Sequence, residues 1–272
     1  MTQGDAALAA VLKRDRAVVL VALLTLAALA WAYVLWLAAQ MYAPSPDMPS
    51  MSMAEMAAMM SPGFTPWTLT HALFIFAMWS VMMVGMMTPS AAPMILIYTQ
   101  VARQAGTLGK PFASAAWFAS GYLIAWTGFA LVATAAQYGL ERAALLSPMM
   151  ASTSHIFGGG LLIAAGVYQW TPLKNACLSQ CRAPLAFVQS HGGFPSSGFG
   201  SLRLGLLHGA DCVGCCWALM ALLFVGGVMN PLWIAGLMIF VLAEKILPGA
   251  RYVSRLAGAL AAAAGVWLIW AA

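Results

Sequence analysis

Long apolar stretches separated by short polar segments dominate the sequence. Seven stretches have roughly the 17–25 residues needed to cross the hydrocarbon core of a bilayer as a helix. The second contains Pro89 and Pro93, which favour a kink. The last two are short, so six spans, with the seventh stretch lying in the membrane interface, is the alternative. The stretches cover residues 17–39, 69–97, 113–137, 154–173, 204–227, 231–247 and 256–272.

This pattern predicts an all-α fold, a polytopic helix bundle in a single membrane domain. The composition agrees, because 63% of the 272 residues are hydrophobic and only 7% are charged, whereas soluble domains have about 25% charged residues. A water-soluble fold could not hide so much apolar surface. The first stretch is also longer than the apolar region of a signal peptide, roughly 7–15 residues, and we expect it to be a span.

The basic residues predict how the bundle is oriented. Lys and Arg concentrate on the cytoplasmic side of membrane proteins. With the N-terminus in the cytoplasm, Arg142 lies outside and the other eleven of the twelve basic residues lie inside. The net charge of +5 is therefore a topology signal and not a sign of nucleic-acid binding. The prediction is N-in and C-out. The inner basic residues are Lys13, Arg14, Arg16, Arg103, Lys110, Lys174, Arg182, Arg203, Lys245, Arg251 and Arg255.

The fifth stretch carries an unusual group of soft metal ligands. Steps of three, four or eight residues put them on one face of a helix, and thiolates select Cu(I), zinc or iron–sulfur clusters. One face of a single helix suits a metal of low coordination number, which favours Cu(I), with zinc as the alternative. Buried cysteine can also be a small hydrophobic residue. That reading does not explain Asp211, because a carboxylate inside a membrane is costly. The residues are His208, Asp211, Cys212, Cys215, Cys216 and Met220.

Methionines are abundant in the outer loop, residues 40–68, and in the second stretch. A thioether has no proton to lose and binds Cu(I) without competition from pH. His71, Met78, Met82 and Met86 follow one another at steps of seven, four and four, which is again one helix face. The alternative is ordinary packing by an adaptable side chain. The loop methionines are Met41, Met48, Met51, Met53, Met56, Met59 and Met60, and Met83, Met87 and Met94 complete the second stretch.

The inner loop, residues 174–203, contributes two further cysteines. Cys177 and Cys181 are four residues apart, so they face the same way on a helical turn. In the reducing cytoplasm they should remain thiols, and nearby basic residues would favour the thiolate. A metal pair, a redox pair and incidental residues all remain open. Because this loop enters the fifth stretch from the same side, we expect all five cysteines near the inner half of the bundle.

Two charged residues stand at the inner end of the sixth stretch. Glu244 and Lys245 are adjacent, and a charged pair of this kind commonly extends to the membrane interface. The alternative is that Glu244 reaches across the bundle to Arg203 or to the cysteine face.

Several motifs together resemble a family of bacterial integral membrane proteins described as predicted metal-binding, with a domain of unknown function. They run from about residue 78 to 247. The resemblance implies a helical fold in the bacterial inner membrane and a metal-related role. The motifs are Met82-Met83-Val84-Gly85-Met86-Met87-Thr88-Pro89 with Pro93 and Tyr98, Tyr168-Gln169-Trp170-Thr171-Pro172-Leu173-Lys174, Cys177, Cys181-Arg182-Ala183-Pro184, Gly205-Leu206-Leu207-His208-Gly209, Cys212-Val213-Gly214-Cys215-Cys216-Trp217, Gly227-Val228-Met229-Asn230 and Glu244-Lys245.

These observations predict a Cu(I)-binding membrane protein that transfers, stores or delivers copper for cuproenzyme assembly. We expect the methionines to receive or release the ion outside and His71 with its methionine face to carry it partway. The three cysteines of the fifth stretch and His208 would hold it, with Asp211 balancing charge, and Cys177 and Cys181 would exchange it inside. The partner would be a cuproenzyme, a metallochaperone or a membrane complex.

Two alternatives stay open. One is a membrane thiol oxidoreductase using Cys212 and Cys215, which have the C-x-x-C spacing. The other is an accessory subunit of a larger membrane complex. The sequence has no phosphate-binding loop of the G-x-x-x-x-G-K-[ST] form and no arrangement typical of hydrolases. We therefore expect neither ATP-driven transport nor hydrolysis.

Overall fold

The computed structural model describes the backbone of residues 3–42, 67–107 and 115–271. Within these ranges the chain is helical, with one isolated β-bridge between Leu146 and Ser152. The all-α prediction is confirmed. The helices are α1 (Gln3–Tyr42), α3 (Leu69–Thr107), α4 (Ala115–Arg142), α5 (His155–Tyr168), α6 (Pro172–Arg182), α7 (Pro184–Ser190), α8 (Gly198–Ala221), α9 (Leu223–Gly226), α10 (Pro231–Ile246) and α11 (Ala250–Trp270).

Five helical segments are long and apolar enough to cross a membrane, which indicates a multi-pass membrane protein. They lie in α1, α3, α4, α8 with α9, and α11. The predicted number of seven is not confirmed, because α5 has 14 residues and α10 has 16. At 1.5 Å per residue each is shorter than the roughly 30 Å hydrocarbon core.

Local signals explain why these two helices are short. Gln169 and Trp170 form a turn after α5, and Thr171 then caps α6, with Pro172 in the first turn. Proline is favoured in that turn because its missing N–H would have no intrahelical partner there. The helix α10 begins behind the cap Asn230 and ends at Ile246, two residues before Pro248.

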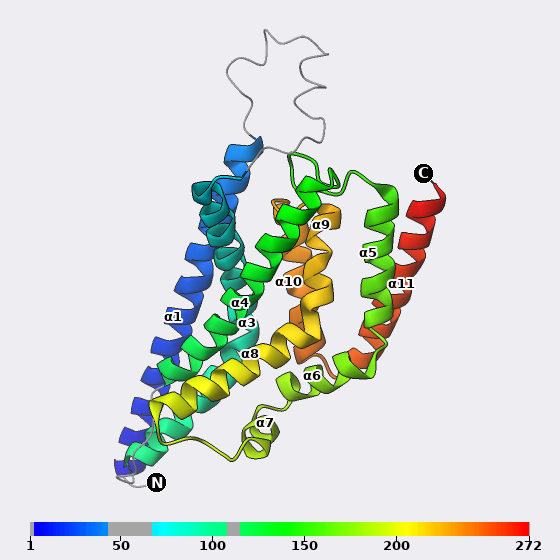
Figure 1. Ribbon diagram of the computed structural model, residues 1–272. Coiled ribbons are helices and arrows are strands. Elements are labelled where there is room, and N and C mark those ends of the chain that lie inside the picture. The colour runs from blue at the N-terminus through cyan, green and yellow to red at the C-terminus, as the bar shows by residue number, and fades with distance from the viewer. Residues whose placement is uncertain (1–2, 43–66, 108–114, 272) are drawn as a thin grey trace.

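The helices form two groups joined through α10 (Figure 1). The first contains α1, α3, α4 and α8, in which α1 packs on α3 and α4 packs on both α3 and α8. The second is the pair of α5 and α11, and α10 contacts members of both groups. The short helices α6 and α7 lie at one end of the bundle, where α6 packs on α8.

Glycines allow the closest helix crossings, as small residues do in membrane bundles. A Cβ at Gly205 of α8 would stand 2.0 Å from the carbonyl oxygen of Phe118, and one at Gly121 of α4 would stand 2.0 Å from that of Leu202. In the second group, Gly166 of α5 meets Gly258 of α11. The backbones of α4 and α8 therefore touch, which brings Tyr122 next to the cysteine-bearing part of α8.

The prolines in α3 do not end that helix, which runs without interruption from Leu69 to Thr107. A helical proline leaves the carbonyl four residues earlier without its usual N–H partner. The carbonyls affected are those of Gly85 and Pro89. The hydroxyls of Thr88 and Ser90 in the same turns donate to the neighbouring carbonyls of Val84 and Met87.

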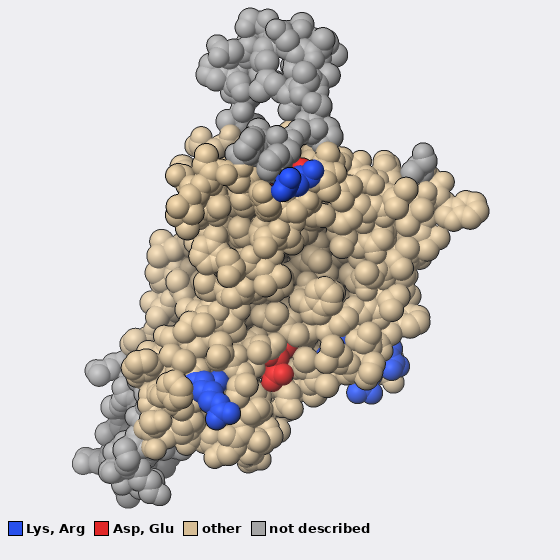
Figure 2. Space-filling view, in the orientation of Figure 1, with Lys and Arg blue, Asp and Glu red and all other residues tan. Residues whose placement is uncertain are grey.

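Charged side chains lie toward the two ends of the bundle. On the face shown in Figure 2, a broad uncharged band separates them. Many large apolar side chains in the described helices are exposed, among them Leu24, Leu131 and Trp267. An uncharged, apolar belt of this kind matches the surface that lipid would cover.

Candidate metal centre

Four cysteines from two helices converge inside the bundle. Cys212, Cys215 and Cys216 of α8 are buried, with relative exposures of 0%, 2% and 0%. The thiol of Cys181, on α6, interacts with the side chains of Cys212 and Cys215. We call these four residues the thiol cluster. All of its cysteines are free.

A lysine from a third helix contacts the cluster. The Nζ of Lys245 on α10 donates to the Sγ of Cys212 at 2.8 Å and to the Oγ of Ser90 on α3 at 3.0 Å. The hydroxyl of Tyr122 on α4 lies 3.2 Å from the same sulfur. The sulfur of Cys212 is thus contacted from α4 and α10, and Ser90 of α3 holds the lysine in place. A sulfur that accepts from an ammonium group is in the surroundings that stabilise a thiolate.

The other two cysteines of α8 are hydrogen-bonded to their own helix. The thiols of Cys215 and Cys216 donate to the carbonyl oxygen of Cys212 at 3.1 and 3.0 Å. This follows from their spacing, because residues three and four positions later lie directly above that carbonyl. Their sulfurs therefore stay within one helical turn of Cys212.

Cys177 lies beside the cluster, at the contact between α6 and α8. A Cβ at Gly214 would be 2.8 Å from its Sγ, so glycine leaves the room that this sulfur occupies. Burial raises the pKa of the Cys177 thiol, and the carboxylate of Asp211 raises it further. Hydrogen bonding to Cys212 and Cys215, together with burial, raises the pKa of the Cys181 thiol. Both α6 cysteines are therefore neutral thiols at pH 7.

His208 lies one helical turn before Cys212 and is 3% exposed. Its ring packs among those of Phe118, Tyr122 and Phe187, with centroids 5.0 to 6.0 Å away. Its Nδ1 is buried and has no hydrogen-bond partner within the described part of the chain. Buried polar atoms are normally paired, so this nitrogen is a free donor or acceptor next to the thiols.

Asp211 is at the edge of the cluster and is partly exposed. Its electrostatic neighbours are His191, Cys177 and Cys212.

The predicted methionine face divides into a buried and an exposed part. Met78, Met82 and Met86 are buried in the core, with exposures of 0%, 1% and 2%. His71 is exposed near the opposite end of α3, where its ring meets that of Trp67 at 5.1 Å. The structure does not bring His71 to the thiol cluster. Met41 ends the apolar part of α1, and the remaining loop methionines lie outside the described residues.

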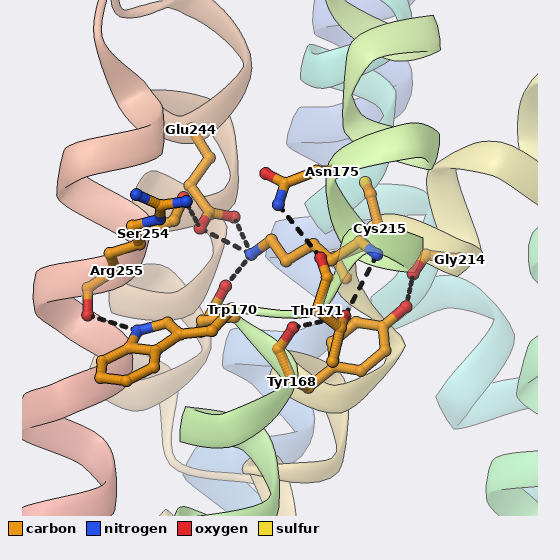
Figure 3. A network of polar contacts seen from close by, with 12 residues as sticks. Tyr168, Trp170, Thr171, Asn175, Gly214, Cys215, Glu244, Ser254 and Arg255 are labelled. Atoms are coloured by element: carbon orange, nitrogen blue, oxygen red, sulfur yellow. Dashed lines mark hydrogen bonds and ion pairs between the residues drawn. The ribbon is translucent and has the colours of Figure 1, made fainter.

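A second polar network adjoins the thiol cluster. The Nζ of Lys174 donates to the two carboxylate oxygens of Glu244 at 2.6 and 2.8 Å, and also to Gln169. Ser254 of α11 donates to Glu244 at 2.6 Å. Figure 3 shows Glu244 and Ser254 facing each other in this network, with Cys215 nearby. The expected position of Glu244 at the membrane interface is wrong, because this side chain is 1% exposed. Its ion-pair partner is Lys174 of α6, in place of the alternative Arg203.

The described residues contain no group of three or more His, Cys, Asp or Glu side chains whose positions could hold a metal ion. A tetrahedral structural site would require such a group. Cu(I) is also stable with two sulfur ligands, and the cluster offers several pairs. The donor set therefore fits a soft monovalent ion bound by few ligands.

Comparison with protein families decides the class. Residues 76–268 match the PpoB2 family, described as a copper chaperone. The chain belongs to the PpoB2 copper chaperone family. No curated protein and no solved structure matches the chain.

The PpoB2 match covers every cysteine of the chain and all the helices that build the site, from most of α3 to most of α11. It agrees with the resemblance to a metal-binding family, and its description names copper as the metal. It gives zinc no support. The alternative functions, oxidoreductase and accessory subunit, are not favoured by it.

Sequence reasoning missed three residues at the thiol cluster and in the polar network beside it. Lys245 was expected at the interface, Lys174 was counted as a topology charge, and Tyr122 was not singled out. A signal existed for the lysines: Glu244 and Lys245 are adjacent, so they point in different directions from α10 and each requires its own partner. For Tyr122 the signal was only Gly121, a small residue that allows close helix approach.

Proposed function

We propose that this protein is an integral membrane copper chaperone that binds Cu(I) at the thiol cluster and delivers it for cuproenzyme assembly at the bacterial inner membrane. One observation carries the proposal. In a member of a copper chaperone family, thiols from α6 and α8 meet around Cys212 inside an apolar bundle.

The chemistry of the donors supports Cu(I). Thiolate and thioether groups are soft ligands that prefer Cu(I) to hard cations. The thiols of Cys181 and Cys212, which lie on different helices, are sufficient for a two-coordinate ion. Cys215 and Cys216 then need not change their conformation. Zinc would need four ligands in a tetrahedron, while Cys215 and Cys216 have thiols directed at a backbone carbonyl.

Transfer requires a path to and from the cluster. We propose that the buried methionines of α3 conduct the ion from the outer side, with His71 and the outer methionines at the entrance. Cys177 is partly exposed beside the cluster, and we propose that it exchanges the ion with a partner on the inner side. Asp211 and His208 adjust the charge and the ligand set at the cluster.

Metal content tests the proposal most directly. The full chain, purified in detergent under anaerobic conditions and loaded with Cu(I), is compared with a Cys212→Ser, Cys215→Ser, Cys216→Ser triple variant by plasma mass spectrometry. We expect near-stoichiometric copper in the parent and its loss in the variant. Unchanged copper in the triple variant would overturn the proposal.

The single variant Cys177→Ser is the matched control. It removes a thiol from α6 that lies beside the cluster and not in it. We expect this variant to keep its copper and to hand it more slowly to an acceptor. Gel filtration of each variant verifies that the bundle is intact.

A further inference from the structure

The end of α10 places a positive charge against the sulfur that lies at the centre of the cluster. Lys245 is in the last turn of α10 and partly buried, and its Nζ contacts Cys212 at 2.8 Å. Its second hydrogen-bond partner, Ser90, is neutral. The ammonium group therefore has the cysteine sulfur as its closest source of negative charge.

The other charged groups near the cluster are already compensated or screened. Glu244, the neighbour of Lys245 in sequence, forms its ion pair with Lys174. Asp211 is partly exposed, with His191 and Cys177 beside it, so water weakens its effect. Among the described residues, Lys245 is thus the cation in direct contact with the thiol cluster.

We propose that Lys245 determines the charge of the metal that the cluster accepts, so that it favours monovalent Cu(I) over divalent Zn(II). This inference rests on the proposed function and names the residue that makes its site selective. Lys245 acts as a positioning and charge-balancing residue, because it contacts the ligand sulfur and does not bind the metal.

The argument follows from the charges of the two complexes. Binding by Cys181 and Cys212 requires both sulfurs as thiolates, so each thiol that carries a proton releases it to solvent when the metal binds. Two thiolates with Cu(I) carry one net negative charge, which the ammonium of Lys245 cancels. Two thiolates with Zn(II) are neutral, and the ammonium then remains as an uncompensated charge in the bundle.

An uncompensated charge is costly in this environment. Cys212 is buried and Lys245 is partly buried, and an ion in an apolar interior loses hydration that only a partner can replace. The attraction between the ammonium and a complex of opposite charge a few ångströms away stabilises the Cu(I) complex and is missing from the Zn(II) complex. The effect on metal preference is therefore expected to be on the order of a hundredfold or more.

The test compares the affinities of the full chain for Cu(I) and Zn(II), measured by competition with chelators in detergent. Lys245→Gln keeps a hydrogen-bond donor near Cys212 and removes the charge, whereas Lys245→Arg keeps the charge. Arg251→Gln is the matched control, because Arg251 is an exposed residue near the same end of the bundle. We expect the ratio of Cu(I) to Zn(II) affinity to fall by on the order of a hundredfold in Lys245→Gln. It should stay near the parent value in the two other variants.

The outcomes separate the two proposals. A parent that binds no Cu(I) overturns the proposed function together with this inference. A parent that binds Cu(I), with an unchanged affinity ratio in Lys245→Gln, overturns only the role of Lys245. Should Lys245→Gln not fold, Lys245→Met provides the second comparison: it should lower the affinity ratio to the same extent, and an unchanged ratio would overturn the role of Lys245.

Discussion

Glu244 on α10 and Lys174 on α6 form a buried ion pair, with a carboxylate oxygen 2.6 Å from the ammonium nitrogen. Gln169 and Ser254 complete their hydrogen bonding. The pair ties α6 to α10 and α11 at a point one residue before Lys245. Two adjacent residues of α10 therefore have different roles. Glu244 anchors α6, the helix that carries Cys181, and Lys245 brings its ammonium group to the sulfur of Cys212.

The first prediction concerns this ion pair. Glu244→Gln leaves the ammonium of Lys174 buried without its counter-charge. Removing one partner of a buried pair costs about 3–5 kcal/mol, so thermal denaturation in detergent should show a much less stable protein. Since α6 loses its anchor, the thiol of Cys181 should also react faster with an alkylating reagent.

A double variant is the control. Lys174→Met with Glu244→Met removes both charges, and replacing a buried pair by apolar residues is often close to neutral. We expect the double variant to be more stable than Glu244→Gln alone. Equal loss in both would show that the pair does not behave as a coupled unit.

The second prediction separates the two cysteines of α6. Cys181→Ser removes a sulfur that interacts with Cys212 and Cys215, whereas Cys177→Ser removes one that lies against Gly214. Changes in the outer shell of a metal site already cost 10–100-fold in affinity, so loss of a ligand should lower Cu(I) affinity by about a hundredfold or more. Cys177→Ser should change it little. Chelator competition measures both, and the reverse order of effects would contradict the assignment.

The sequence predicted the parts of the fold that depend on composition. Apolar stretches and the few charges were sufficient to predict helices in a membrane. The length of α5 was not predicted, because apolar residues continue past its end at Tyr168 to the point where Thr171 and Pro172 start α6. The bounds of α10, Pro231–Ile246, lie close to those of the predicted stretch 231–247. Hydropathy averages over such local signals, so it overestimates the number of full spans.

The part of the candidate site that lies on one helix could be predicted from the sequence, whereas most contacts between helices could not. The spacing of Cys212, Cys215 and Cys216 predicts their common turn, and the chain topology predicts that Cys181 approaches them. Lys245 could not be assigned, since its contact with Cys212 depends on how α10 rotates against α8. That rotation depends on how side chains of several helices pack together. The residue pattern of a single helix carries no information about this packing.

The third prediction concerns the crossing of α4 and α8. At Gly205 an added Cβ would stand 2.0 Å from the Phe118 carbonyl oxygen, whereas at Gly128 it would meet nothing within 4 Å. Overpacking typically costs about 1–3 kcal/mol, so Gly205→Ala should lower the denaturation temperature. Gly128→Ala should leave it unchanged or raise it, because alanine is the better helix former.

The same pair of variants also probes the site. Separating α4 from α8 moves Tyr122 away from Cys212, so Gly205→Ala should weaken Cu(I) binding. Gly128→Ala should bind like the parent. If the two variants were equally stable, the close crossing would not be a determinant of the fold.

The fourth prediction concerns orientation. The distribution of basic residues predicts that the end of the bundle that carries α6 and α7 faces the cytoplasm and that the C-terminal end of α4 faces outside. Ser196→Cys lies in the loop before α8 and Ala143→Cys follows α4, and both positions are exposed. In intact spheroplasts, a maleimide that cannot cross membranes should label Ala143→Cys at once and Ser196→Cys only after permeabilisation. The parent, whose native thiols are partly or fully buried, gives the background, and labelling of Ser196→Cys without permeabilisation would reverse the topology and the direction assigned to copper transfer.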